Sequence, residues 1–289
     1  MNKPLFTGTC TAMVTPFLDD QINYPLLELL LERQISAGIP AVVICGTTGE
    51  APTLSDKEKE SLFRFSKSVV GNRMKIIAGT GSNDTKHAVT LSQCAQDCGA
   101  DGILAVSPYY NKATENGLYL HYKAIADSVD IPVIVYNVPS RTGQDIPVSV
   151  YQRLCTIPNI AGVKEASVSM EKVLQIKALC SKDFYIWAGN DDLTVPTISI
   201  GGKGVISVLS NLFPAQMQAM SLAALTDDYG KAAALQRSLF PISKLISREI
   251  NPVGIKAAMK LHGLDCGGCR LPLTEPLKEN MEALKNYFA

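Results

Sequence analysis

Short apolar runs alternate along the chain with longer segments in which apolar residues recur every third or fourth position. The short runs are rich in valine and isoleucine, which is typical of strands buried on both faces, and the longer segments have the period of amphipathic helices. Many of the longer segments stop at a glycine, as helices do, and the next apolar run follows within a few residues. This repeat predicts strand–helix units in succession.

The pattern predicts about eight strands, each followed by a helical segment, before the alternation ends after Ser210. Local signals support the boundaries: Asn23 is placed to cap one helix, and Ser55 with Glu58 has the spacing of a capping box. We expect strands at 9–14, 41–45, 75–78, 103–106, 132–136, 160–164, 184–188 and 204–208. We expect helices at 24–37, 55–71, 84–98, 115–129, 148–154, 170–179, 193–200, 214–225, 229–247, 252–261 and 275–288.

Eight such units in a little over 200 residues indicate an α/β protein with a (β/α)8 TIM barrel and a C-terminal helical extension. We expect residues 1–224 to form the catalytic barrel and 225–289 the extension, because no linker-like stretch separates them into independent domains. A doubly wound open sheet is the alternative. Its usual phosphate-binding fingerprint, GxGxxG after the first strand, is absent.

The composition is that of a globular protein, with 46% hydrophobic and 19% charged residues and a formal net charge of zero. We therefore expect no general attraction to nucleic acid and no membrane association, since no apolar run approaches the roughly 20 residues of a span. The start of the chain has no signal-like apolar run, and eight scattered cysteines read as free thiols, so we expect a cytoplasmic protein.

Neither cysteine nor histidine spacing predicts a metal site. Cys266 and Cys269 have CxxC spacing, but the sequence contains no second CxxC pair to complete a four-ligand site, and the three histidines lie far apart. We expect no structural metal, and any role of this pair stays open. We place the single tryptophan, Trp187, in the core, and Tyr122 on a helix surface or interface.

Lys164 ends the predicted buried strand 160–164 and is the first candidate for chemistry. A charged amine taken out of water is costly, so burial favours the neutral amine, which is a nucleophile towards carbonyl groups. We therefore predict that Lys164 forms a Schiff base. The alternatives are a lysine that reaches the solvent from the strand end and one that pairs with Glu165.

Other polar residues also follow predicted strands, and in a TIM barrel these strand ends share one rim. Thr47 and Thr48 lie in a glycine-flanked turn that can form a nest for a carboxylate. Tyr136 ends its strand and could transfer protons, and Arg141 could bind a second carboxylate in bidentate fashion. A plain turn, a core tyrosine and a surface arginine remain the alternatives for these positions.

Taken together, these motifs resemble the dihydrodipicolinate synthase family, within the superfamily of pyruvate-dependent class I aldolases and N-acetylneuraminate lyase. The likeness runs in order from about Phe6 to the C-terminal helices, and each motif falls at a predicted strand end. The motifs are GTTGE at 46–50, PYYN at 108–111, YNVPSRTG at 136–143, VKEA at 163–166 and GVIS at 204–207.

The resemblance implies a lyase, 4-hydroxy-tetrahydrodipicolinate synthase (EC 4.3.3.7), of lysine and diaminopimelate biosynthesis. Lys164 would condense with pyruvate, and the resulting enamine would attack the aldehyde of L-aspartate 4-semialdehyde. The family needs no cofactor, since the lysine is the electron sink, and we assign no metal-binding residue. Its members are usually homotetramers built from two tight dimers.

The resemblance also assigns the remaining site residues. Thr48 and Tyr136 would shuttle protons together with Tyr110, which a neighbouring subunit supplies. Thr47 and Thr48 would bind the pyruvate carboxylate, and Arg141 that of the semialdehyde. Gly189 and Ile206 match backbone contacts near the lysine.

One departure concerns regulation by lysine, which in sensitive family members binds a second site between subunits. Asn83 and Tyr109 match that site, whereas Ala51, Asp56, Lys59 and His87 do not. His87 in place of a glutamate, together with Lys59, removes negative charge from a pocket for a cation. We expect weak lysine inhibition or none.

Two other functions stay open. A sugar-acid aldolase or N-acetylneuraminate lyase would share the barrel, the lysine and the tyrosine, but would usually lack an arginine at position 141. A barrel that only binds a keto acid would lack a catalytic group, whereas Lys164, Tyr136, Thr48 and Tyr110 are all present.

Overall fold

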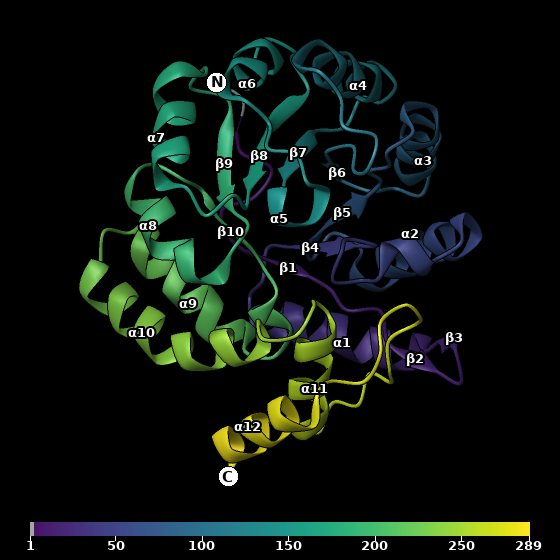
Figure 1. The fold of residues 1–289 in the computed structure, drawn as a ribbon, viewed down its shortest axis with the longest axis vertical. Coiled ribbons are helices and arrows are strands. Elements are labelled where there is room, and N and C mark those ends of the chain that lie inside the picture. Colours follow the sequence, from purple (N-terminus) through teal and green to yellow (C-terminus); the bar gives the residue numbers. More distant parts are fainter. Residues whose placement is uncertain (1–2) are drawn as a thin grey trace.

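The computed structural model describes residues 3–289, and its centre is a closed barrel of parallel strands (Figure 1). Neighbouring strands follow the order β1, β10, β9, β8, β7, β6, β5 and β4, and β4 pairs with β1 again. The TIM-barrel prediction is confirmed, and closure excludes the open sheet. The strands are β1 (Gly8–Ala12), β4 (Ala41–Ile44), β5 (Lys75–Gly79), β6 (Gly102–Val106), β7 (Val133–Asn137), β8 (Ile160–Glu165), β9 (Tyr185–Ala188) and β10 (Gly204–Ser207).

Helices surround this barrel in the order that the sequence pattern predicts (Figure 1). The predicted caps are present: Asn23 Oδ1 accepts from Leu26 N at 3.1 Å, and Ser55 and Glu58 form a capping box. The helices of the barrel are α1 (Tyr24–Ser36), α2 (Asp56–Val70), α3 (Thr85–Asp97), α4 (Glu115–Asp127), α6 (Val148–Leu154), α7 (Met170–Leu179), α8 (Thr194–Ser199) and α9 (Pro214–Leu225).

Strand alternation divides the core into two layers. Val43 points into the barrel and Val42 points outwards to the helices, and both are fully buried. Trp187 is fully buried inside the barrel and stacks on Phe6, as predicted. The surface placement of Tyr122 is wrong: it is fully buried in the outer layer, and its hydroxyl donates to Ala105 O at 3.4 Å.

Two small elements escape the sequence pattern. The hairpin β2 (Phe17–Leu18) and β3 (Gln21–Ile22) turns at Asp19 and Asp20, both with positive φ. Its strands are too short to show alternation. The one-turn helix α5 (Pro139–Thr142) lies where we expect a loop, in front of the barrel mouth in Figure 1.

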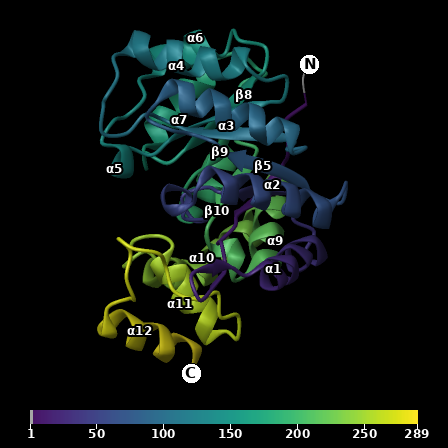
Figure 2. The same cartoon turned by 90° about the vertical axis from the view of Figure 1, so that its right-hand side faces the viewer.

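The C-terminal extension contains α10 (Tyr229–Ile246), α11 (Val253–Leu261) and α12 (Lys278–Phe288). Both views place α11 and α12 below the barrel (Figures 1 and 2). The extension is bonded back to the N-terminal region, where Phe17 N donates to Cys266 O at 2.9 Å and Arg270 bonds Asp20 and Glu58. It is therefore attached to the barrel, and the boundary at 224/225 stays a prediction. None of the helices within residues 3–289 is long and apolar enough to cross a membrane.

Candidate active site

Lys164 points into the barrel from β8. Its neighbour Val163 packs in the outer layer, so alternation directs Lys164 inwards, where only 5% of the residue is exposed. Its Nζ lies 4.2 Å from the ring centroid of Tyr136, the residue opposite it on β7. A lysine that reaches the solvent is therefore excluded.

Glu165 points to the other side of the strand, which excludes the pairing with Lys164. Its carboxylate accepts from Asn137 Nδ2 at 2.8 Å, from Ser167 N at 2.8 Å and from the Tyr151 hydroxyl at 3.2 Å. These three donors satisfy it. The lysine is left facing the cavity at the carboxyl ends of the strands.

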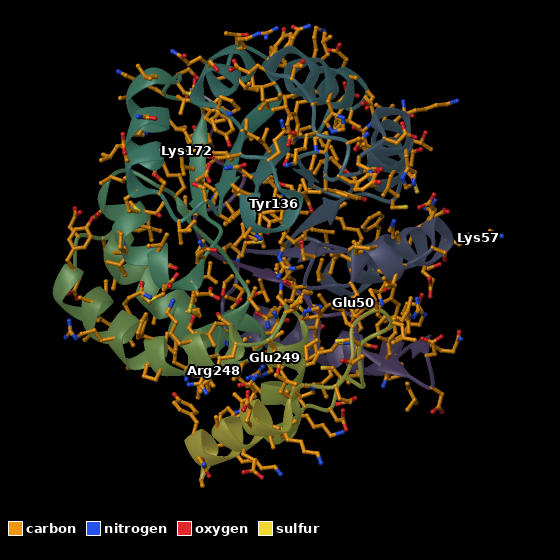
Figure 3. All side chains as sticks on the ribbon, in the orientation of Figure 1. Glu50, Lys57, Tyr136, Lys172, Arg248 and Glu249 are labelled. Atoms are coloured by element: carbon orange, nitrogen blue, oxygen red, sulfur yellow. The ribbon has the colours of Figure 1, made fainter. Side chains whose placement is uncertain are left out.

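That cavity has a volume of about 350 Å³ and brings together most of the expected residues. It is lined by Lys164, Tyr136, Thr48, Arg141 and Gly189, which come from well-separated parts of the sequence. Figure 3 shows Tyr136 near the middle of the barrel. The cavity is large enough for two small keto or aldehyde acids.

Asp191, which follows β9, also lines the cavity, and the sequence analysis gave it no role. Its Oδ2 accepts from Leu209 N at 2.9 Å and from Val208 N at 3.2 Å. Burial raises the pKa of the Asp191 carboxyl, while the Ser207 hydroxyl, these N–H groups and the Lys164 charge oppose that rise. Asp191 thus places an enclosed carboxyl group within the field of the lysine.

Thr48 is held by the loop that follows β4. Within this loop, the N–H groups of Gly49 and Ala51 donate to Gly46 O and are therefore not available to a bound anion. An anion nest is restricted to the N–H groups nearer Thr48. Thr48 itself is 2% exposed, and its Oγ1 accepts from Asn251 Nδ2 at 2.9 Å. Asn251 belongs to the C-terminal extension, lines the same cavity and is the second residue that the sequence analysis missed.

Glu50 anchors the other end of this loop. Its carboxylate forms a fully buried ion pair with Lys256 Nζ at 2.6 Å and accepts from Arg270 N at 2.9 Å. Lys256 Nζ also donates to Gly268 O at 3.0 Å. The extension therefore fixes the loop that carries Thr47 and Thr48, and Figure 3 shows where Glu50 lies.

Arg141 lies on α5, exposed at the mouth of the cavity. Asn137 fixes the segment that carries it, because its Nδ2 donates to Asp145 Oδ1 at 2.7 Å and its Oδ1 accepts from Ile146 N at 3.1 Å. An exposed guanidinium held on a fixed turn can receive a carboxylate that enters from the solvent.

The remaining expected residues lie elsewhere. Thr47 lines an adjoining cavity of about 370 Å³, which shares Tyr136 and Arg141 with the first. Ile206 is fully buried in β10, opposite Cys10 of β1. Tyr110 is 93% exposed and lines neither of these two cavities.

The adjoining cavity contains the positions that depart from the family's lysine site. Lys59 and His87 line it, and both contact Asp56, at 3.5 Å from Lys59 Nζ and 3.0 Å from His87 Nε2. Tyr109 lines it as well. Asp56 is thus the only acidic residue described in contact with Lys59 and His87, and it is already paired with both.

A closed (β/α)8 barrel with a buried lysine and a tyrosine in one cavity at its carboxyl-terminal mouth has the architecture of a barrel enzyme. The family model of the dihydrodipicolinate synthetase family matches residues 5–288. The chain therefore belongs to this family.

Named relatives and solved structures agree over the full length. A protein of Acetivibrio thermocellus, named 4-hydroxy-tetrahydrodipicolinate synthase, is 45% identical over 285 residues, covering 99% of this chain and 97% of that protein. The solved 4-hydroxy-tetrahydrodipicolinate synthase of Methylacidiphilum fumariolicum SolV is 43% identical with a TM-score of 0.96, covering 98% of this chain and 95% of that one. The chloride-inhibited dihydrodipicolinate synthase of Acinetobacter baumannii, solved with pyruvate, is 38% identical with a TM-score of 0.95, covering 97% of each chain.

Proposed function

We propose that the chain condenses pyruvate with L-aspartate 4-semialdehyde and so acts as a 4-hydroxy-tetrahydrodipicolinate synthase of lysine and diaminopimelate biosynthesis. The observation that carries this proposal is the contact between Lys164 and Tyr136, at 4.2 Å, in a cavity that also contains Thr48 and Arg141. Family membership and the shared name of full-length relatives support it.

The first half-reaction takes place on Lys164. Its neutral amine adds to the C2 carbonyl of pyruvate, and loss of water gives an imine. The imine nitrogen then takes up the electron pair released when a methyl proton leaves, and an enamine forms. Because the imine itself serves as the electron sink, this step needs no cofactor.

The second half-reaction joins the carbon chains. The enamine carbon attacks the aldehyde of the semialdehyde and regenerates an imine, and the amino group of the adduct displaces Lys164 as the ring closes. The lysine leaves as a free amine, ready for the next cycle.

The other residues handle protons and carboxylates. Tyr136 lies against the amine and Thr48 lines the same cavity, so both are placed to relay the protons of imine formation. We assign Thr47 and Thr48 to the pyruvate carboxylate and Arg141 to that of the semialdehyde. Gly189 and Ile206 contribute backbone groups beside the lysine.

Tyr110 fits the relay only as a residue donated to a neighbouring subunit, because it is 93% exposed on its own chain. We therefore propose a homo-oligomer, in the form of a homotetramer made of two tight dimers. All eight cysteines are free, which fits a reducing compartment, and we propose the cytoplasm as the location.

The sugar-directed sibling reactions are the second candidate. They would use the same lysine and tyrosine, but an arginine at the mouth favours a short aldehyde that carries a carboxylate.

The test measures condensation of the two substrates in a coupled reductase assay, for the wild type and Lys164→Ala. We expect activity to fall by about 10³-fold or more in the variant, because the covalent route is lost. Lys123→Ala, at an exposed pair with Asp127 on α4 that lines neither cavity, is the matched control and should keep full activity.

Borohydride reduction in the presence of pyruvate, followed by mass spectrometry, separates the alternatives. An adduct on Lys164 together with condensation confirms the proposal. An adduct on Lys164 without condensation would indicate that the second substrate is a sugar acid. The absence of any adduct would indicate a barrel that binds a keto acid without catalysis.

A further inference from the structure

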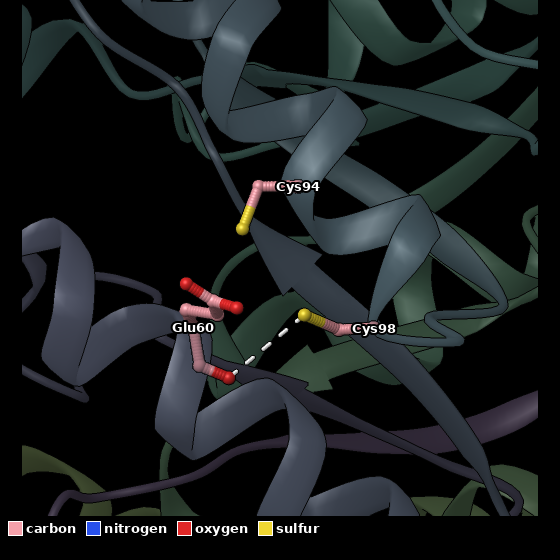
Figure 4. Close-up of side chains that lie close together, drawn as sticks. All are labelled: Glu60, Cys94 and Cys98. Atoms are coloured by element: carbon pink, nitrogen blue, oxygen red, sulfur yellow. Dashed lines mark hydrogen bonds between the residues drawn. The ribbon is translucent and has the colours of Figure 1, made fainter.

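Two cysteines and one glutamate converge at the seam between α2 and α3, away from the cavities described above. Cys94 and Cys98 are one helical turn apart, at the C-terminal end of α3, and Glu60 faces them from α2. One sulfur or oxygen atom from each residue lies within 4.8 Å of the others. Figure 4 shows both sulfur atoms and the Glu60 carboxylate facing the same space.

This spacing is close to that of a coordinated cation. In a tetrahedral zinc site with Zn–S bonds of about 2.3 Å, two sulfur ligands lie about 3.8 Å apart. Ligand atoms that start within 4.8 Å need to approach by an ångström at most. Residues four apart on a helix present their side chains on one face, so both thiols can turn towards one ion.

The charges around the group suit a divalent ion. Arg64 binds only Oε1 of Glu60, at 3.0 Å and 3.1 Å from its Nη2 and Nε, so Oε2 is available as a ligand. Two thiolates and one carboxylate carry three negative charges, which a divalent cation and the Arg64 guanidinium together neutralise. Two further contacts are described, a weak one from Cys98 Sγ to Glu60 O at 3.9 Å and a side-chain hydrogen bond between Cys94 and Cys98.

We propose that Glu60, Cys94 and Cys98 form a site for a thiophilic divalent cation of the zinc class, with a solvent molecule as the fourth ligand. Glu60 and Cys94 are partly exposed, which lets an ion enter and leaves room for that solvent ligand. The bound ion would cross-link α2 to α3. Thiolate ligands select zinc or cadmium over magnesium or calcium.

The sequence pattern gave no sign of this site, because Glu60 is more than thirty positions away from Cys94 and only the packing of α2 on α3 brings them together. The chain also offers internal comparisons. Cys155 and Cys180 lie close to one another but belong to no such three-residue group within residues 3–289. Cys266 and Cys269, whose thiol pKa values burial raises to about 12, belong to no such group among the described residues either.

The test titrates the reduced, metal-free protein with Cd²⁺ and follows the ultraviolet absorption of cadmium–thiolate bonds, and then adds Zn²⁺ as a competitor. We expect one Cd²⁺ per chain, displaced by Zn²⁺. Cys94→Ser and Cys98→Ser should each weaken binding by about tenfold or more, and Glu60→Gln should also weaken it. Cys180→Ser is the matched control and should bind like the wild type.

Alkylation adds a readout that does not depend on absorption. Zn²⁺ should protect Cys94 and Cys98 of the wild type from alkylation, as mapped by mass spectrometry, and this protection should be lost in Glu60→Gln. Because Glu60 is partly exposed, that variant should fold even if a cysteine variant does not. No cadmium–thiolate absorption, or binding unaffected in Cys94→Ser and Glu60→Gln, would overturn the proposal. Its success or failure is independent of condensation activity.

Discussion

The side chain that most affects the chemistry of Thr48 comes from the opposite end of the chain. Asn251 Nδ2 donates to Thr48 Oγ1 at 2.9 Å. Because the hydroxyl oxygen accepts this bond, its own proton is free to point towards the cavity. Asn251 is therefore a positioning residue for the proposed proton relay.

Removing this donor should lower turnover more than substrate binding. We expect Asn251→Ala to reduce kcat by about three- to tenfold with little change in KM, since one neutral hydrogen bond contributes about 0.5–1.5 kcal/mol. The coupled assay measures both constants, and far-UV circular dichroism checks the fold. Asn251→Asp, which cannot donate, should behave similarly, and wild-type kcat in both variants would contradict the role.

At the scale of elements, the GTTGE loop depends on the extension as much as on its own strand. Lys256 of α11 forms the buried pair with Glu50, with side chains 4% and 1% exposed. Breaking one partner of such a pair leaves the other charge buried without compensation. We therefore expect the loop and the extension to lose their structure together when this pair is broken.

Lys256→Met should destabilise the protein by about 3–5 kcal/mol and lower activity by displacing Thr47 and Thr48. Denaturant unfolding measures the free energy, and the coupled assay measures the activity. The matched control is Lys123→Met, whose exposed pair with Asp127 contributes about 0–1 kcal/mol. Adding Glu50→Leu to Lys256→Met should recover stability, and equal losses in the Lys256 and Lys123 variants would contradict the role of the buried pair.

The contacts between the extension and the GTTGE loop could not be predicted from the sequence. The Ser55 capping box could be predicted because its partners are three residues apart, and the buried strands because their composition is local. The bonds from Asn251 to Thr48 and from Lys256 to Glu50 join residues 203 and 206 positions apart. Bonds between residues so far apart leave no periodic pattern in the sequence. Most of the residues on the rim of the barrel could therefore be predicted, but not the contacts that hold them in place.

The cavity next to the active site predicts how the enzyme responds to lysine. Lys59 and His87 line it, and Asp56 is already bonded to both. A cationic effector would meet the Lys59 ammonium group and no free carboxylate among these residues. In initial-rate assays we expect no more than weak inhibition in millimolar L-lysine.

A charge reversal gives the matched experiment. The double variant Lys59→His, His87→Glu should become more sensitive to lysine than the wild type, because it restores negative charge to the cavity. Half-maximal inhibition of the wild type at sub-millimolar lysine would show that another group binds the effector.

At the scale of the whole molecule, Tyr110 is the one residue of the proposed proton relay that lines neither cavity of its own chain. The barrel places Lys164 and Tyr136 of one chain in the same cavity, whereas Tyr110 of that chain is 93% exposed and has positive φ. Tyrosine is enriched at protein–protein interfaces, so an exposed Tyr110 fits a contact with a neighbouring subunit. If Tyr110 serves the neighbouring site, each subunit supplies the tyrosine that completes the active site of the other.

Mixed oligomers test this exchange directly. Lys164→Ala and Tyr110→Phe should each be strongly impaired alone, but a hybrid dimer has one complete site, which combines Lys164 of one chain with Tyr110 of the other. Random pairing in co-expressed, doubly tagged protein should therefore restore about a quarter of wild-type activity. Mixing Lys164→Ala with Tyr136→Phe is the matched control and should restore none, because Lys164 and Tyr136 lie 4.2 Å apart on one chain. If the first mixture is as inactive as the second, Tyr110 does not act across the interface.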